Sequence, residues 1–233
     1  MVANPRLDTF YYVELVGISV GGARVPGVLA ADLRLDPATG KGGVIVDSGT
    51  SVTRLARPAY TALRDAFRAG TAGLKPAASF SLFETCYDLS GMTEVKVPKV
   101  VMHFRGAGGR AAVADLALPA ENYLIPVATN AVFCFAFAGT DSGISIIGNI
   151  QQQGFRVVFD GAGSRVGFAP ALADPPLRRH KKREKMGLLS GLEMWYLSCN
   201  SASLSWLIQL MWRIIPTLPN GSHQRQTEVW GGS

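Results

Sequence analysis

The chain has 233 residues, 48% of them hydrophobic and 17% charged, a composition typical of a globular protein rather than a disordered or fibrous one. Its formal net charge of +6 is uneven, because residues 1–170 hold 15 Lys and Arg against 13 Asp and Glu, whereas residues 171–233 hold 8 against 4. The basic excess therefore belongs mainly to the last quarter of the chain, and we expect no nucleic-acid partner.

Residues 10–170 consist mostly of short β-type runs bounded by turn-forming residues. The first run, at 10–16, is rich in aromatic and β-branched side chains. Residues 18–20 and 23–25 predict a hairpin across Gly21 and Gly22, since glycine accepts positive φ at both turn positions. Further strands are predicted at residues 44–46, 95–104, 132–137, 144–147, 155–159 and 166–168.

One clear helix is predicted, at residues 58–69. Pro58 suits the first helical position, Gly70 suits the end, and apolar side chains recur on one face at Tyr60, Leu63 and Phe67. Short strands with a few short helices predict a mainly β domain.

The composition changes after Pro176. A basic run at 178–185 precedes an apolar stretch and a polar end. Residues 194–212 carry no charge, but they include Asn200, Gln209 and several serines, so a membrane span is not favoured. A poorly ordered tail is expected, with contact to a membrane surface as the less favoured alternative.

Residues 17–21 match the Gly-x-Ser-x-Gly pattern of a serine hydrolase. That pattern works on a turn from a strand into a helix, whereas here a hairpin follows. Outside the tail the sequence has one histidine, His103, within an apolar run. We therefore predict Ser19 to be an ordinary strand residue and His103 a strand-face or buried histidine, with a catalytic triad as the minor alternative.

The three cysteines, Cys86, Cys134 and Cys199, do not have the spacing of a zinc site. One disulfide and one odd thiol are expected in an oxidising compartment, or three reduced thiols elsewhere. No metal and no cofactor is predicted. The first residues lack the apolar stretch of a secretory signal.

The strongest candidate site follows the apolar residues 44–46, where Asp47, Ser48, Gly49 and Thr50 stand in succession. A buried strand would hold the carboxylate in one orientation, with hydroxyl and backbone donors in reach, as suits a general base for water. The alternative is an Asp that caps a turn, and the spacing alone favours this alternative.

Residues 44–51 resemble the second active-site motif of the pepsin-like aspartic proteases. Further blocks resemble the plant nepenthesin-like branch of that family, in the same order, at residues 8–13, 17–22, 86–91, 121–126, 146–160 and 164–169. The resemblance implies that residues 8–172 form a single C-terminal lobe of the bilobal pepsin-like fold. Residues 173–233 then form a tail unlike anything in the family.

The resemblance also implies roles for individual residues. Asp47 would be one of two catalytic carboxylates, which share a proton because like charges a few Å apart do not both ionise. Ser48 would brace the lobes and Thr50 would hydrogen-bond the carboxylate, while Gly49 would line the substrate cleft. Ile146 would wall a subsite or simply belong to a core strand.

Two further assignments follow from the resemblance. Cys86 and Cys134 would form the disulfide of this lobe, which leaves Cys199 odd. A second Asp-Ser-Gly at 141–143 is predicted to be a surface turn, because residues 138–140 are typical of a turn and no apolar strand is predicted to lead into it.

The first lobe, with the first catalytic Asp, is absent from this sequence. We therefore expect an aspartic endopeptidase by family whose isolated chain is inactive, with a peptide or protein substrate and the missing N-terminal lobe as partners. A homodimer that restores a symmetric site is a minor alternative. A non-catalytic inhibitor on the same fold is the alternative from another functional class. The family implies a secreted or vacuolar protein.

Overall fold

The computed structural model describes residues 1–108, 112–127 and 131–171. The chain divides into two compact units, Met1–Pro175 and Pro176–Ser233, and all described residues lie in the first. The tail predicted at 173–233, including Cys199, lies outside the described residues.

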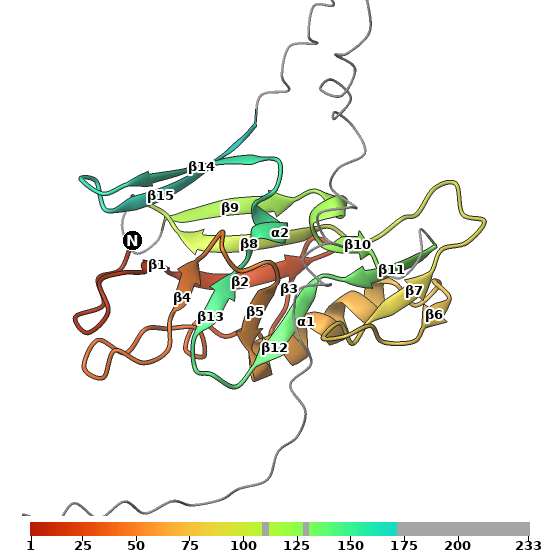
Figure 1. Cartoon of the computed structure of the whole chain (residues 1–233), viewed down its shortest axis with the longest axis horizontal. Coiled ribbons are helices and arrows are strands. Elements are labelled where there is room, and N and C mark those ends of the chain that lie inside the picture. Colours follow the sequence, from red (N-terminus) through yellow and green to blue (C-terminus); the bar gives the residue numbers. More distant parts are fainter. Residues whose placement is uncertain (109–111, 128–130, 172–233) are drawn as a thin grey trace, which may run out of the picture. The chain divides into compact units, whose positions relative to one another are not determined.

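The first sheet has five strands in the order β1-β4-β13-β5-β12. Their bounds are, in that order, Tyr11–Val13, Val44–Val46, Ser145–Ile147, Thr53–Ala56 and Phe137–Thr140. β13 runs parallel to β4 and antiparallel to β5, and the remaining pairs are β1 with β4 (antiparallel) and β12 with β5 (parallel). A late strand thus lies between two early ones (Figure 1).

The second sheet has four antiparallel strands in the order β3-β2-β8-β9. Their bounds are Ala23–Arg24, Leu15–Val20, Val100–Arg105 and Val113–Leu118. The predicted hairpin is confirmed, with Ser19 opposite Arg24 across a turn in which Gly21 and Gly22 have φ of 60° and 88°. Two consecutive positive φ values explain why both turn residues are glycine.

The third sheet has the order β10-β11-β7-β6, with bounds Leu124–Pro126, Val132–Phe135, Cys86–Asp88 and Pro76–Ala77. Cys86 and Cys134 are opposite each other on β7 and β11 and are joined by a disulfide. This is the pair expected from the resemblance. A separate hairpin joins β14 (Phe155–Asp160) to β15 (Arg165–Pro170).

The predicted helix is confirmed as α1, Arg57–Gly70. It buries Tyr60, Leu63 and Phe67 against the largest apolar cluster of the lobe. Phe67 stacks on Phe135 with ring centroids 4.1 Å apart, so the helix is fixed to the sheets by aromatic packing. Two short helical segments complete the described part, the 3₁₀-helix η1 (Ala120–Asn122) and α2 (Asn149–Gln152).

The mainly β fold class is confirmed, but three strand boundaries were predicted wrongly. The run at 10–16 is two strands, because the chain leaves the first sheet after Val13 and joins the second at Leu15. The run at 132–137 is likewise divided at Ala136 between β11 and β12. The run at 95–104 pairs with a neighbour only from Val100 onward. In each case the strand boundary depends on which distant segment the chain pairs with, and residue type alone does not show this.

Candidate active-site loop

Asp47 begins a loop that crosses the end of a neighbouring strand. Because β13 lies between β4 and β5, residues 47–52, which connect β4 to β5, pass over the carboxyl end of β13. The Asp47 amide donates to the carbonyl of Ile147 (3.1 Å), and the Asn149 amide donates to the carbonyl of Thr50 (2.6 Å). The Ile150 amide donates to the carbonyl of Ser51 (3.0 Å). The loop is therefore fixed by residues about a hundred positions later in the chain.

Gly148 makes this crossing possible. A Cβ atom added there would lie 2.7 Å from the carbonyl oxygen of Ser51 and 2.7 Å from the carbonyl carbon of Val52. The Gly148 amide also donates to the Thr53 hydroxyl (2.9 Å). The close approach of the two backbones requires a residue without a side chain.

The carboxylate of Asp47 is held by two local donors. Its Oδ1 accepts from the amide of Gly49 (2.9 Å), and its Oδ2 accepts from the hydroxyl of Thr50 (2.7 Å). The side of the loop at Ser48 and Gly49 is exposed, while Asp47 and Thr50 are partly buried. A carboxylate oxygen accepts more than one hydrogen bond, so each oxygen keeps capacity for a water or a substrate group.

Three of the residues predicted for the site, Asp47, Gly49 and Thr50, are thus in direct contact, and Ser48 stands exposed beside them. Ile146 lies on β13 opposite Ile45 and packs, half-buried, against the apolar cluster that includes Tyr12. This packing agrees with the core-strand alternative. Its place at a subsite stays a prediction.

A network of buried amide groups, which was not predicted from the sequence, supports the loop. Gln151 is fully buried; its amide donates to the carbonyls of Asn122 (2.8 Å) and Ala136 (3.0 Å) and its oxygen accepts from the Thr53 hydroxyl. Gln152 donates to the carbonyl of Ile147 (2.9 Å). The run of three glutamines at 151–153, separated by three residues from the strand 145–147, was the available indication, because a buried amide needs several partners.

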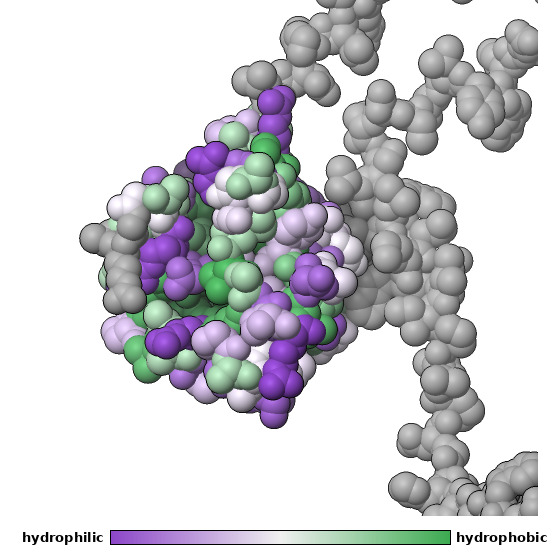
Figure 2. Space-filling view, turned by 90° about the vertical axis from the view of Figure 1, so that its left-hand side faces the viewer, coloured by the Kyte–Doolittle hydropathy of each residue, from purple (hydrophilic) through white to green (hydrophobic). Residues whose placement is uncertain are grey.

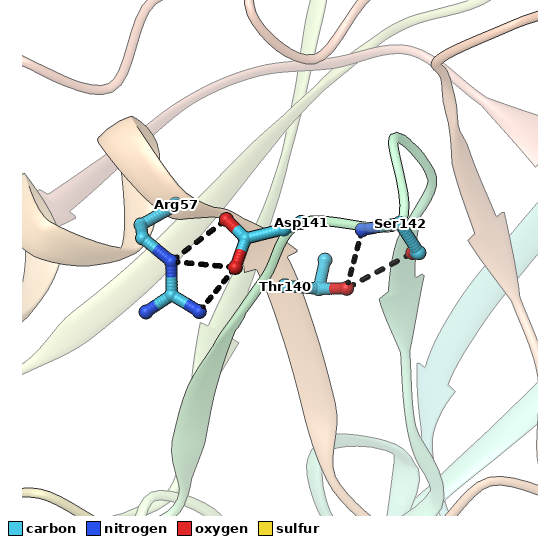
Figure 3. A network of polar contacts seen from close by, with 4 residues as sticks. All are labelled: Arg57, Thr140, Asp141 and Ser142. Atoms are coloured by element: carbon cyan, nitrogen blue, oxygen red, sulfur yellow. Dashed lines mark hydrogen bonds and ion pairs between the residues drawn. The ribbon is translucent and has the colours of Figure 1, made fainter. Parts of the chain in front are cut away.

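The second Asp-Ser-Gly is a surface turn, as predicted (Figure 3). Arg57 donates hydrogen bonds to the Asp141 carboxylate from Nε (2.8 Å to Oδ1) and Nη2 (2.7 Å to Oδ2), and the Asp141 side chain is 72% exposed. The hydrogen bond from Arg57 holds the pKa of Asp141 below its ordinary value. The expectation that no strand leads into this turn was wrong, because β12 ends at Thr140. This strand pairs on one side only, at the edge of its sheet.

Exposed apolar side chains gather near the first strand and the last hairpin. Tyr11 on β1 and Phe159 on β14 have ring centroids 4.3 Å apart, and both are more than a third exposed. We call these two residues the exposed apolar patch. Figure 2 views the side on which the turn of this hairpin lies and shows hydrophobic surface between hydrophilic groups.

The described residues form neither a metal site nor a membrane-spanning helix. Among the residues that the structure describes, no three His, Cys, Asp or Glu side chains converge in the way that a metal ion would need. No helix in the same part of the chain is long and apolar enough to cross a membrane. The uncharged stretch at 194–212 lies outside it.

Comparisons with known proteins identify relatives over most of the described region. The family described as xylanase inhibitor C-terminal matches residues 10–170. Aspartyl protease family protein 2 of Arabidopsis thaliana is 69% identical over 170 residues, which are 73% of this chain and 33% of that protein. Aspartic proteinase nepenthesin-1 of Nepenthes gracilis is 37% identical over 172 residues, 73% of this chain and 37% of that protein.

The fold has a solved counterpart as well. The crystal structure of edgp superposes with a TM-score of 0.59 at 22% identity, over 69% of this chain and 39% of that one. The chain spans about a third of the length of the two relatives. It belongs to the xylanase inhibitor C-terminal family and is a nepenthesin-like plant member of the pepsin-like aspartic proteases, represented here by one lobe of their fold.

Proposed function

We propose that this lobe supplies one catalytic carboxylate, Asp47, to an aspartic endopeptidase. The observation that carries the proposal is a pair of hydrogen bonds to that carboxylate, one from the Gly49 amide and one from the Thr50 hydroxyl. The loop that bears them is itself hydrogen-bonded to the end of β13. Relatives named aspartyl proteases support the reaction class. In such a reaction one carboxylate takes a proton from the attacking water, while a second carboxylate donates to the peptide oxygen.

The second carboxylate would come from an N-terminal lobe. The exposed apolar patch supports this, since Tyr11 on the edge strand β1 and Phe159 present exposed aromatic surface at the edge of the first sheet. One carboxylate alone lacks the partner that shares its proton. We therefore expect the isolated chain to cleave no peptide, and we expect peptides or proteins to be the substrates of the two-lobe protein.

The test is a fusion of this chain to the N-terminal lobe of the 69% identical Arabidopsis relative. Cleavage of a denatured protein substrate at pH 3–5 is expected from the fusion, and none from the isolated chain. The chain offers a matched control, because Asp47→Asn and Asp141→Asn change the same residue type in the same tripeptide. Asp47→Asn should abolish cleavage and Asp141→Asn should leave it unchanged. A folded fusion that cleaves equally well with Asn at position 47 would exclude the proposed role.

The second candidate is an inhibitor or other binding protein without catalysis, and the description of the matched family as xylanase inhibitor C-terminal favours considering it. Pepstatin distinguishes the two, because a transition-state mimic binds tightly only where both carboxylates are present. Tight pepstatin binding by the fusion, lost with Asp47→Asn, supports the protease. Inhibition of a xylanase by the fusion, with no pepstatin binding, supports the inhibitor.

The compartment is part of the same proposal. The Cys86–Cys134 disulfide supports an oxidising, secretory location, such as the vacuole or the cell exterior, because such bonds persist there. A tagged full-length protein that stays in the cytosol of plant cells would contradict this location.

A further inference from the structure

Three polar side chains form a hydrogen-bonded chain across the second sheet, away from the Asp47 loop. The Ser19 hydroxyl lies 2.7 Å from Nε2 of His103, and Nδ1 of His103 lies 2.6 Å from Oδ1 of Asp115. His103 on β8 is directly opposite Asp115 on β9, while Ser19 on β2 lies diagonally across from it. The three residues alternate with Ile18, Met102 and Leu116, which face the core. They therefore share the outer face of the sheet.

The acceptor at one end sets the roles of the two ring nitrogens. An ionised carboxylate only accepts hydrogen bonds. In the neutral imidazole form of His103, Nδ1 therefore carries the hydrogen and donates a hydrogen bond to Asp115. Nε2 is then the acceptor for the Ser19 hydroxyl. The order of serine to Nε2 and carboxylate to Nδ1 is that of an activated Ser-His-Asp nucleophile. Asp115 has no role that its sequence position alone predicts, because only the register of β8 and β9 places it opposite His103.

The hydroxyl of Ser19 is shielded from solvent, and Arg24 is its neighbour on the same face of the sheet. Ser19 is 6% exposed and the His103 side chain is 12% exposed, although both point outward from the sheet. Arg24 lies opposite Ser19 on the two-residue strand β3 and donates from Nη1 to the carbonyl of Val16 (3.1 Å). Its guanidinium fills the space that Gly17 leaves, since a Cβ atom at Gly17 would overlap it. Arg24 is long and exposed, so its side chain can move without unfolding the sheet.

We propose that Ser19 is a reactive hydroxyl that takes up one acyl or phosphonyl group from small activated electrophiles. His103 is the general base and Asp115 is a positioning residue that holds the imidazole. With a fluorophosphonate, the Ser19 oxygen forms a bond to phosphorus, the phosphorus–fluorine bond breaks, and fluoride leaves. The hydroxyl proton passes to Nε2 of His103 and then to water. This reactivity is independent of Asp47 and of the proposed protease function.

The experiment exposes the full-length chain, with its disulfide intact, to a fluorophosphonate probe at pH 8, where histidine is ordinarily neutral. The modified residue is located by mass spectrometry of peptides. Labelling of Ser19 is expected, with none in Ser19→Ala. His103→Gln should slow labelling by ~100-fold or more, the usual contribution of a general base. Arg24→Ala should speed labelling because it removes a long side chain next to Ser19 on the same face of the sheet.

Further variants separate reactivity from folding. Asp115→Asn should slow labelling and Asp115→Glu should restore it, while the thermal unfolding of each variant shows that the lobe is folded. Ser142→Ala removes an exposed hydroxyl that has no imidazole in contact and should change nothing. The proposal is overturned if neither the wild type nor Arg24→Ala is labelled at Ser19. It is also overturned if labelling at Ser19 is undiminished in folded His103→Gln, because the hydroxyl would then react without its base.

Discussion

Gly148→Ala tests the claim that the Asp47 loop depends on a close approach of two backbones. The new Cβ would lie 2.7 Å from the Ser51 oxygen and 2.7 Å from the Val52 carbonyl carbon, so one backbone must shift by about half an ångström. Overpacking of this kind costs about 1–3 kcal/mol. The shift also weakens the hydrogen bonds from Asn149 to Thr50 and from Ile150 to Ser51, at about 1 kcal/mol each when lost. We expect a loss of about 2–4 kcal/mol in the free energy of unfolding.

Urea unfolding of the disulfide-bonded chain, followed by circular dichroism, measures this loss. Gly161→Ala is the matched control, because no atom lies within 4 Å of its Cβ position and its φ is not in the left-handed region. The control should change the free energy of unfolding by less than about 0.5 kcal/mol. If Gly148→Ala is as mild as Gly161→Ala, the crossing is looser than described and the reasoning on the Asp47 loop fails.

Two further predictions concern the stability of the lobe. Replacing both Cys86 and Cys134 by Ser should lower the free energy of unfolding by about 4 kcal/mol, which is the loop-entropy value for two cysteines 48 positions apart. A urea midpoint equal to that of the wild type would contradict this prediction. The lobe should also lose stability in acid, because hydrogen bonds hold the pKa values of several carboxyls below the ordinary range near 4 in the folded state. Such groups stabilise the folded state above their unfolded pKa, and the stabilisation disappears as the pH falls through the folded value. They are Asp36, Asp88, Asp141 and Asp160. The melting temperature should therefore fall between pH 5 and pH 2, and a flat or rising profile would refute the attribution.

The sequence was sufficient for features that depend on local chemistry. The hairpin at Gly21 and Gly22 needs positive φ twice, and the helix at Arg57–Gly70 has an apolar face and a proline in its first turn. The contact of Asp47 with Gly49 and Thr50 is also local, since it spans three residues. Short-range spacing therefore indicated both the strand end and the residues around the carboxylate.

Features that depend on distant pairing could not be read from the sequence. Glu14 is the one charged residue in the run at 10–16, but its charge does not show that the chain changes sheets there. Gln151 supports the loop only because residues 122, 136 and 53 meet there. Asp115 contacts His103 only because the register of β8 and β9 places the two residues opposite each other. In all three cases the partner is chosen by the tertiary fold, which overrides local preference.

The position of β13 between β4 and β5 has a consequence for how the lobe is made. Val44 pairs with Ser145 in parallel, and Thr53 on β5 pairs in parallel with Phe137, so both contacts close very long segments of chain. On a ribosome, the loop with Asp47 emerges long before the strand that fixes it. Until residues 145–150 have been synthesised, the strands at 44–46 and 53–56 lack their shared neighbour and are exposed to wrong pairing. The loop that carries Asp47 thus becomes ordered only after residues about a hundred positions later in the chain have been synthesised.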